Sequence, residues 1–322
     1  MQRVIVQALG GPEQLLLESG PEVRQPVAGE VLVDVEAAGV NFLDINLRKG
    51  AGVHAMPAPF TPGLEGVGRI RAVGVGVSLI VGQRVAWINV RGSYATQLVM
   101  KADLVVPVPD SLAISQVLLF QAMTAQYLAT EYGPIEPGDH VLVHAAAGGV
   151  GQLLVQWLKH LGAWVVGTTS SEEKAEVARA AGADVVINYG RDYRFLDELM
   201  RLTHGRGVDL AFDSVGAATF ANTVKGLARG GMAVCCGVSS GPAPAISPAE
   251  LTTRCTRIAA GSLFSYIVEP GEFQLRAASV IEGIEAGWLR MPEATAYPMA
   301  SAADAHRAIE SRLTHGKLYL VP

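Results

Sequence analysis

Short apolar runs broken by glycine and proline fill the first third of the chain. Clear examples lie at residues 31–35, 68–73 and 84–87. Short strands at this spacing, separated by turn signals, are typical of a compact antiparallel or barrel-like domain. A helical stretch is expected to follow from about residue 115 to residue 132.

From residue 139 onward the pattern changes to apolar strands that alternate with helices. The strands are expected at 141–145, 164–168, 185–187, 208–212 and 232–236. The helices are expected at 150–161, 172–181, 193–203 and 219–228, with a sixth strand at 257–264 and later helices at 273–287 and 302–311. This alternation predicts βαβ units and a parallel sheet, so the fold class is α/β with a second, β-rich domain.

Composition narrows the class of protein. The 322 residues suffice for two domains, and 50% of them are hydrophobic while 17% are charged, which predicts a large buried core. The net charge of −5 and the lack of a basic run argue against a nucleic-acid partner. No signal peptide or membrane-spanning segment is evident, and three cysteines do not form a disulfide framework. A cytoplasmic protein is therefore expected.

The candidate phosphate loop is Gly148-Gly149-Val150-Gly151, between the first strand and the first helix of the alternating region. Glycines permit a tight turn and a close approach of backbone N–H groups to a pyrophosphate at a helix N-terminus. The spacing departs from the usual G-x-G-x-x-G, and a glycine-rich turn without a ligand is the alternative. The succession of strand–helix units around the loop favours dinucleotide binding.

The end of the second strand of this region selects the cofactor. Glu172 is a possible ribose ligand, as in NAD-binding proteins, but Ser170-x-x-Glu173 reads as a capping box that places Glu172 in a helix. Thr169 and Ser170 can instead bond a 2′-phosphate, and Lys174 can neutralise its charge. The sequence therefore predicts NADPH, although Lys174 as an ordinary solvated lysine remains an alternative.

Several motifs in a fixed order resemble the medium-chain dehydrogenase/reductase superfamily, and within it the zeta-crystallin-like quinone oxidoreductases. The resemblance covers essentially the whole chain. The motifs are Gly10-Gly11-Pro12-Glu13, Gly39-Val40-Asn41-Phe42-Leu43-Asp44, His144-Ala145-Ala146-Ala147-Gly148-Gly149-Val150-Gly151, Val186-Ile187-Asn188-Tyr189, Asp213-Ser214-Val215-Gly216, Glu310-Ser311-Arg312 and Gly316-Lys317.

This resemblance implies a domain arrangement and a set of cofactor contacts. A GroES-like catalytic domain would comprise residues 1–118 and 265–322, and a Rossmann domain would comprise residues 119–264, with the active site in the cleft between them. Asn41 would lie near the nicotinamide, Lys174 and Tyr189 would hold the adenosine phosphate, and the other contacts would be Thr124, Ser240 and Arg312. Each of these residues also has an ordinary structural interpretation as a turn, helix, loop or surface residue.

Zinc is not expected. Many superfamily members hold zinc with a cysteine and a histidine. At the positions that resemble these ligand positions this chain has Asn41 and Leu64, and no cysteine precedes Cys235. Zinc requires thiolate or imidazole ligands held close together. Cys235 and Cys236 are adjacent on an expected strand, which places their side chains on opposite faces and favours a structural role.

Hydride transfer without a metal needs an electron-poor acceptor such as a quinone or another conjugated carbonyl. Asn41 is expected to polarise the acceptor by hydrogen bonding. Family members often have a tyrosine soon after the Asn41 segment, whereas this chain has none there. His54 is the candidate replacement as a proton donor, with an exposed loop histidine as the alternative.

The expected activity is therefore NADPH-dependent quinone reduction. Two alternatives remain open: an NADPH-dependent enoyl-thioester or enone reductase, and an NADPH-binding sensor or structural protein with little turnover. The resemblance also suggests a homodimer joined through the strand at 257–264, because an apolar edge strand needs to be covered.

Overall fold

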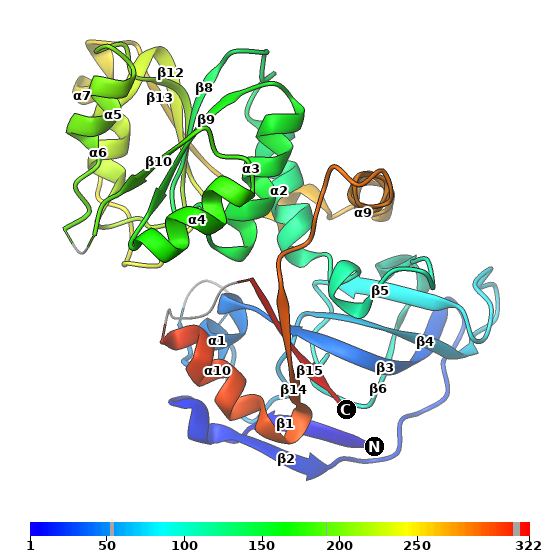
Figure 1. Ribbon diagram of the computed structural model, residues 1–322. Helices are drawn as coiled ribbons and strands as arrows, with labels where there is room; N and C mark the ends of the chain where they lie inside the picture. Colours follow the sequence, from blue (N-terminus) through cyan, green and yellow to red (C-terminus); the bar gives the residue numbers. More distant parts are fainter. Residues whose placement is uncertain (52–54, 191, 312–315) are drawn as a thin grey trace. The chain divides into compact units, whose positions relative to one another are not determined.

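The structure is a computed structural model that describes residues 1–51, 55–190, 192–311 and 316–322 (Figure 1). The chain forms two compact units. The β-rich unit contains Met1–Phe120, Glu269–Ile281 and Met291–Pro322. The parallel-sheet unit contains Gln121–Val268 and Glu282–Arg290.

A six-stranded, fully parallel sheet forms the centre of the parallel-sheet unit. Its strand order is β10-β9-β8-β11-β12-β13. The strands are β8 (His140–Val143), β9 (Trp164–Thr169), β10 (Val185–Asn188), β11 (Val208–Asp213), β12 (Leu227–Cys235) and β13 (Arg257–Ala260). The direction of strand succession reverses between β8 and β11, which makes the carboxyl ends of these two strands the topological switch point where ligands bind in such sheets.

Helices cover both faces of this sheet, as expected for a doubly wound fold. Figure 1 shows α3 and α4 along one face and α5 and α6 along the other. Besides α9, which is described below, the helices with residues in this unit are α2 (Phe120–Glu131), α3 (Gly149–His160), α4 (Glu172–Ala180), α5 (Leu196–Leu202), α6 (Phe220–Lys225), α7 (Pro248–Thr252) and α8 (Leu263–Tyr266).

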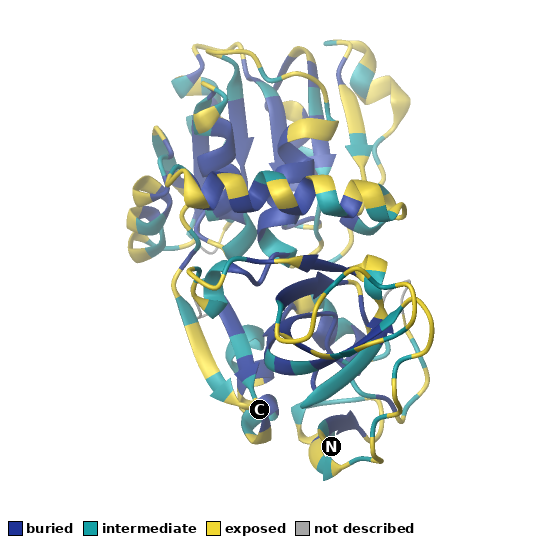
Figure 2. Cartoon of the chain, turned by 90° about the vertical axis from the view of Figure 1, so that its right-hand side faces the viewer, coloured by how far each residue is buried: buried dark blue, intermediate teal, exposed yellow. Residues whose placement is uncertain are grey.

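Burial explains why the strands of this unit read as continuous apolar runs. Figure 2 shows the central strands buried and the helices with one buried and one exposed face. On the face covered by α5 and α6, Val166, Ala211 and Phe195 pack into one core cluster. A strand covered on both faces has no solvent side, so alternation is lost and a short apolar run remains.

The β-rich unit is built around a seven-stranded, mainly antiparallel sheet of order β14-β15-β3-β4-β5-β7, with β6 paired to β3. A two-stranded sheet, β1-β2, accompanies it. The strands are β1 (Gln2–Val6), β2 (Leu15–Ser19), β3 (Glu30–Val40), β4 (Glu65–Val73), β5 (Arg84–Ile88), β6 (Gln97–Lys101), β7 (Val105–Pro107), β14 (Ala294–Pro298) and β15 (Lys317–Val321).

The long strand β3 organises this unit. Its first half pairs with β6, its last residues pair with β15, and β4 runs along its other edge. Two helices of the unit are α1 (Phe42–Arg48), which directly follows β3, and α10 (Ala302–Glu310), which precedes β15. A third helix, α9 (Pro270–Glu285), contains residues of both units.

The expected elements are present, with local differences at their ends. The helix expected from residue 115 begins at Phe120, because residues 114–116 form a 3₁₀ turn. The sixth strand of the parallel sheet stops at Ala260, because Ser262 starts the short helix α8. Cys236 lies just beyond the end of β12 rather than within it. No helix among the described residues is long and apolar enough to cross a membrane.

Candidate functional site

The glycine-rich loop lies at the switch point of the parallel sheet. It connects the end of β8 to Gly149, the first residue of α3. Gly148 caps the helix in extended geometry, and its N–H donates to the Ala145 oxygen over 2.8 Å. A side chain at Gly151 would collide with the Ala145 carbonyl, so this position requires glycine.

The first turn of α3 fits an anionic group. The N–H groups of Gly149, Val150 and Gly151 precede the first bond of the helix ladder, in which Gln152 N–H donates to Gly148. Such groups carry partial positive charge and point out of the helix end, which is the arrangement that holds a pyrophosphate in dinucleotide-binding folds. Gly148 itself is exposed, so a ligand can approach the loop.

Gln121, near the start of α2, is a neighbour of this loop that the sequence reasoning did not identify. A Cβ atom at Gly149 would fall within 2.6 Å of the Gln121 amide carbon, so the two residues are in close contact. The Gln121 Oε1 atom is buried and has no hydrogen-bond partner among the residues that the structure describes. Its one sequence signal is its spacing of three residues from Thr124, which places both on one face of α2.

The residues predicted to contact the adenosine phosphate gather at the carboxyl ends of β9 and β10. Tyr189 directly follows β10, is buried, and its N–H donates to the Thr169 oxygen over 3.0 Å. Ser170 is exposed beside Thr169, and Lys174 is partly buried in the first turn of α4. The structure therefore brings Thr169, Ser170, Lys174 and Tyr189 into one region.

The helix cap at this point is one residue later than the sequence indicated. Ser171, not Ser170, is the N-cap of α4, and its side chain accepts a hydrogen bond from the Lys174 N–H over 3.3 Å. Only Ser170 has a glutamate three residues later, so the capping-box pattern favoured it, but the helix is capped by Ser171 without a capping box. Glu172 still lies in the first helical turn, where its carboxylate pairs with Arg179 over 2.7 Å.

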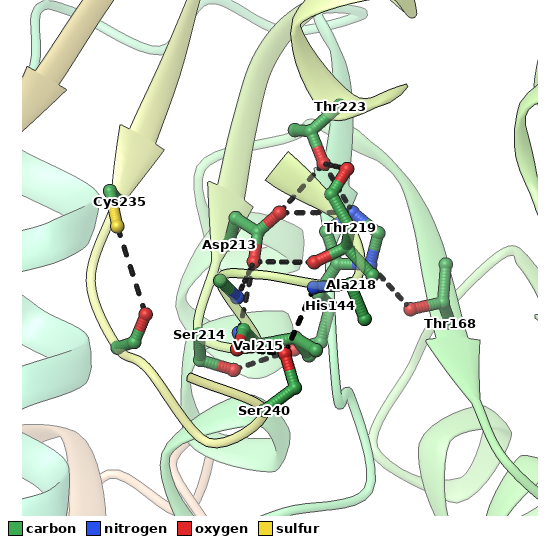
Figure 3. A network of polar contacts seen from close by, with 12 residues as sticks. His144, Thr168, Asp213, Ser214, Val215, Ala218, Thr219, Thr223, Cys235 and Ser240 are labelled. Carbon is green, nitrogen blue, oxygen red and sulfur yellow. Dashed lines mark hydrogen bonds and ion pairs between the residues drawn. The ribbon is translucent and has the colours of Figure 1, made fainter. Parts of the chain in front are cut away.

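The Asp213 carboxylate, at the end of β11, is fully buried and is the centre of a polar network (Figure 3). Its Oδ1 atom accepts hydrogen bonds of 2.9 Å from the Val215 and Gly216 N–H groups and from the Thr219 hydroxyl. Its Oδ2 atom accepts a 2.7 Å hydrogen bond from the Thr223 hydroxyl. Four donors thus compensate for the desolvation of this carboxylate.

His144 extends this network towards β9. Its Nε2 atom lies 2.9 Å from the Thr223 hydroxyl oxygen and its Nδ1 atom lies 2.9 Å from that of Thr168. Because Thr223 gives its single proton to Asp213, it accepts from His144 Nε2–H, and Nδ1 accepts from Thr168. Burial lowers the pKa of His144, consistent with this neutral tautomer. His144 therefore has a structural role in this network.

Ser240 joins the loops that follow β11 and β12. Its hydroxyl donates to the Val215 oxygen over 2.8 Å and accepts from the Ala218 N–H over 3.0 Å. Both hydrogen-bonding roles of the hydroxyl are thus used within the loops. Thr124 lies on α2, also within the parallel-sheet unit, and is partly buried.

Asn41 lies in the β-rich unit, between the end of β3 and the start of α1. Its side-chain amide makes no capping hydrogen bond to α1, although asparagine is a common cap residue. The amide instead donates to Glu65 Oε2 over 3.0 Å and accepts from Lys317 Nζ over 2.9 Å. Glu65 and Lys317 are themselves buried and form an ion pair.

A second buried chain starts from Asp44, whose Oδ2 atom accepts the Asn41 N–H over 2.8 Å. The Tyr94 hydroxyl lies 3.4 Å from Asp44 Oδ2 and 3.1 Å from His306 Nε2. His306 Nδ1 faces the Arg48 guanidinium at 3.5 Å, so the imidazole proton belongs on Nε2. Burial and the Arg48 charge lower the pKa of His306 to about 3, which keeps the ring neutral.

The positions that resemble zinc ligands carry the wrong donors for zinc. Leu64 is buried and apolar, and the Asn41 amide is held by Glu65 and Lys317. Among the described residues there is no group of three or more His, Cys, Asp or Glu side chains arranged to hold a metal ion. His54 and Arg312, both predicted site residues, lie outside the described residues.

Comparison with protein families agrees with this architecture. Residues 27–110 match the alcohol dehydrogenase GroES-like domain, and residues 149–281 match the zinc-binding dehydrogenase family. The chain therefore belongs to the medium-chain dehydrogenase/reductase superfamily.

Comparison with individual proteins shows to which branch of this superfamily the chain belongs. The chain is 35% identical to a 2-haloacrylate reductase from Burkholderia sp, over 99% of this chain and 98% of that protein. It is 33% identical to a quinone oxidoreductase from Pseudomonas aeruginosa, over 100% and 99% of the two chains. The Escherichia coli quinone oxidoreductase, solved in complex with NADPH, superposes with a TM-score of 0.92 at 31% identity, covering both chains fully. The chain belongs to the quinone oxidoreductase branch, which confirms the resemblance found in the sequence.

Thr223 offers a test of the network around Asp213. We expect Thr223→Val to lower the free energy of unfolding by about 1–3 kcal/mol, because it leaves His144 Nε2–H and one Asp213 lone pair without their partner. Thr223→Ser, which keeps the hydroxyl and loses one methyl group, is the matched control. Chemical denaturation measures both variants, and a valine variant as stable as the serine variant would contradict the network.

The Asp44 carboxyl predicts a pH-dependent stability. Burial raises its pKa from 3.8 to about 7, against opposing effects of the Asn41 N–H, the Lys317 charge and Tyr94, while Glu65 raises it further. Between these two values the folded protein holds a proton that the unfolded chain has released, so the contribution of Asp44 to stability falls as the pH rises through about 7.

Asp44→Asn cannot ionise, and its stability relative to the parent protein should therefore increase between about pH 5 and about pH 8. Denaturant unfolding of both proteins across this range measures the difference. The His306 titration is common to both proteins and largely cancels. A difference that stays constant with pH would mean that Asp44 titrates alike in the folded and unfolded states.

Proposed function

We propose that this protein is an NADPH-dependent quinone oxidoreductase that reduces a quinone or a similar conjugated carbonyl. The observation that carries the proposal is the glycine loop at the N-terminus of α3, in a chain similar over its full length to quinone oxidoreductases. One of those relatives, the Escherichia coli quinone oxidoreductase, has been solved in complex with NADPH.

The end of β9 supports NADPH over NADH. Glu172 lies on α4, is exposed, and pairs with Arg179. The strand end itself carries the hydroxyls of Thr169 and Ser170, which do not repel a 2′-phosphate. In the proposed complex the first-turn N–H groups of α3 hold the pyrophosphate, and Lys174 and Tyr189 hold the 2′-phosphate.

The remaining predicted contacts complete the proposal. Thr124, Ser240 and Arg312 line the cofactor site, Asn41 donates a hydrogen bond near the reacting carbonyl, and His54 supplies a proton. When bound, NADPH supplies the hydride, and a quinone that takes this hydride and one proton becomes a hydroquinone. The chain positions the reactants, excludes water and stabilises charge on the acceptor oxygen.

One observation favours a second candidate substrate class. The relative at 35% identity is named a 2-haloacrylate reductase, and a haloacrylate is an alkene conjugated to a carboxylate. Such an alkene accepts hydride at carbon, so the same cofactor site suits an activated alkene such as an enone or an enoyl thioester. The substrate panel described below separates the two classes.

We also infer that two copies of the chain associate through β13. This strand is the last in the order of the parallel sheet, and its residues are mostly exposed, with Ile258 at 41%. Pairing of two such edges across a two-fold axis satisfies their backbone groups. The proposed location of the protein is the cytoplasm, and its proposed partners are small molecules.

The proposed activity is tested by following NADPH oxidation at 340 nm with purified, EDTA-treated protein. A panel of quinones is compared with an enone and an enoyl thioester, with NADH as the alternative donor. We expect quinone turnover with NADPH that is weak with NADH and insensitive to EDTA. Turnover of the alkenes alone would assign the second candidate, and tight NADPH binding without turnover of any acceptor would indicate a sensor.

Gly151 tests the loop itself. A methyl group here collides with the Ala145 carbonyl, so the loop must move away from the geometry that exposes its N–H groups. We expect Gly151→Ala to raise the Kd for NADPH at least about tenfold, equivalent to about 1.4 kcal/mol. Gly271→Ala is the control, because nothing lies within 4 Å of a Cβ at that position. Fluorescence titration with NADPH measures both, and equal Kd values would refute the assigned loop.

A further inference from the structure

The side-chain amide of Asn41 is held in one orientation by two charged groups. Lys317 Nζ lies 2.9 Å from the amide oxygen, and Glu65 Oε2 lies 3.0 Å from the amide nitrogen. An ammonium group has only donors and a carboxylate has only acceptors, so the amide cannot be rotated by 180° without losing both hydrogen bonds. The two charged groups therefore determine that the amide oxygen faces Lys317 and the amide nitrogen faces Glu65.

The two charged groups are buried more deeply than the amide they hold. The side chains of Lys317 and Glu65 are 1% and 0% exposed, whereas Asn41 is 5% exposed. The second oxygen of Glu65 accepts the Phe120 N–H over 2.7 Å, so its position is fixed from two directions. All three residues are buried, and Asn41 is the most exposed of them.

The chain makes room for this ion pair at a specific position. A Cβ atom at Gly39 would overlap the Glu65 carboxylate and lie 2.9 Å from Lys317 Nζ. The absence of a side chain on β3 thus lets both charges reach Asn41. Buried ion pairs contribute little net stability compared with apolar residues of similar volume, because desolvation offsets their attraction. Stability alone therefore gives no reason for two charges here.

We propose that Lys317 and Glu65 are positioning residues that orient Asn41 so that its second N–H donates to the carbonyl oxygen of the acceptor. One Nδ2 hydrogen is used by Glu65, which leaves one for a ligand. Lys317 draws electron density towards the amide oxygen and so strengthens the remaining donor. A donor fixed in advance stabilises negative charge that develops on the acceptor oxygen during hydride transfer.

This inference rests on the proposed reduction of a conjugated carbonyl, and it is tested with a charge-free pair. In Lys317→Met/Glu65→Gln, both charges are removed together, so neither is left buried alone. We expect kcat with the best quinone to fall at least roughly tenfold. The Kd for NADPH should stay within about twofold of the parent value, because the cofactor phosphates bind elsewhere.

The matched control is Arg84→Met/Glu36→Gln. It removes another ion pair of the β-rich unit, in which the Arg84 side chain is 6% exposed and lies 3.0 Å from Glu36. Glu36 also pairs with Arg69 over 2.9 Å, and that pair is lost as well. This control should keep the parent kcat even if its stability is lower. An equal loss of kcat in both double variants would show that loss of charge in the unit, not the orientation of Asn41, causes the effect.

A spectroscopic readout follows the amide directly. The chain has five asparagines, so ¹⁵N-asparagine labelling gives five pairs of side-chain amide resonances, and Asn41→Ala identifies the pair from Asn41. The Asn41 pair should shift in Lys317→Met/Glu65→Gln and stay in place in the control. An Asn41 pair that does not shift would overturn the clamp, and one that shifts while kcat is unchanged would overturn its role in catalysis.

A measurement on the unaltered protein covers the case in which the double variant does not fold. With NADP⁺ and a non-reducible aromatic ketone added, one of the two Asn41 amide protons should shift and the other, bonded to Glu65, should move less. If neither proton responds while the ketone inhibits turnover, the proposal is wrong. If no quinone is turned over by the parent protein, the proposed function fails instead, and the labelled amide still reports whether the clamp exists.

Discussion

A single buried carboxylate sets the geometry of the parallel-sheet unit at its ligand-binding end. Asp213 cannot be desolvated without hydrogen-bond donors, and its four donors come from the loop after β11 and from α6. Through Thr223 and His144 the same constraint reaches Thr168 on β9. The three strand ends that flank the switch point are thus tied together by one chain of hydrogen bonds (Figure 3).

The β-rich unit also compensates for buried charge, but with a different arrangement of charged and neutral groups. Its buried charges, Lys317 and Glu65, compensate for each other and leave a neutral amide at the edge of the cluster. In the parallel-sheet unit a neutral imidazole lies in the interior and the charge lies at the strand end. In both units a buried polar side chain is held by hydrogen bonds from side chains on other elements, Asn41 by Glu65 and Lys317, and Asp213 by Thr219 and Thr223.

The sequence predicted what depends on local patterns. Strand and helix succession follows from the spacing of apolar residues, and the glycine loop follows from its place between a strand and a helix. Element ends were less accurate, as with the cap of α4, because either of two consecutive serines can cap a helix and the capping-box pattern pointed to Ser170 instead of Ser171. The local patterns did not indicate that the β-rich unit contains residues from both ends of the chain.

Contacts between distant residues could not be read from the sequence. Lys317 was noticed only as part of a terminal motif, yet its side chain reaches Asn41, 276 residues earlier. Gln121 resembles any helix residue, although it lies against Gly149. Asp213 was noticed as part of a motif, but its partner Thr223 lies one helix further on. In each case the informative quantity is spatial proximity, which periodicity does not encode.

Because β15 pairs with β3, the two units can complete folding only at different stages of synthesis. The parallel-sheet unit draws most of its residues from one continuous segment, Gln121–Val268, so its sheet can form while the ribosome is still translating later codons. The sheet of the β-rich unit can be completed only later, because β15, which carries Lys317, pairs with β3, made nearly three hundred residues earlier. Until that strand emerges, neither the Lys317–Glu65 ion pair nor the hydrogen bond from Lys317 to Asn41 can form. The nascent chain therefore completes its nucleotide-binding fold before it completes the cluster around Asn41.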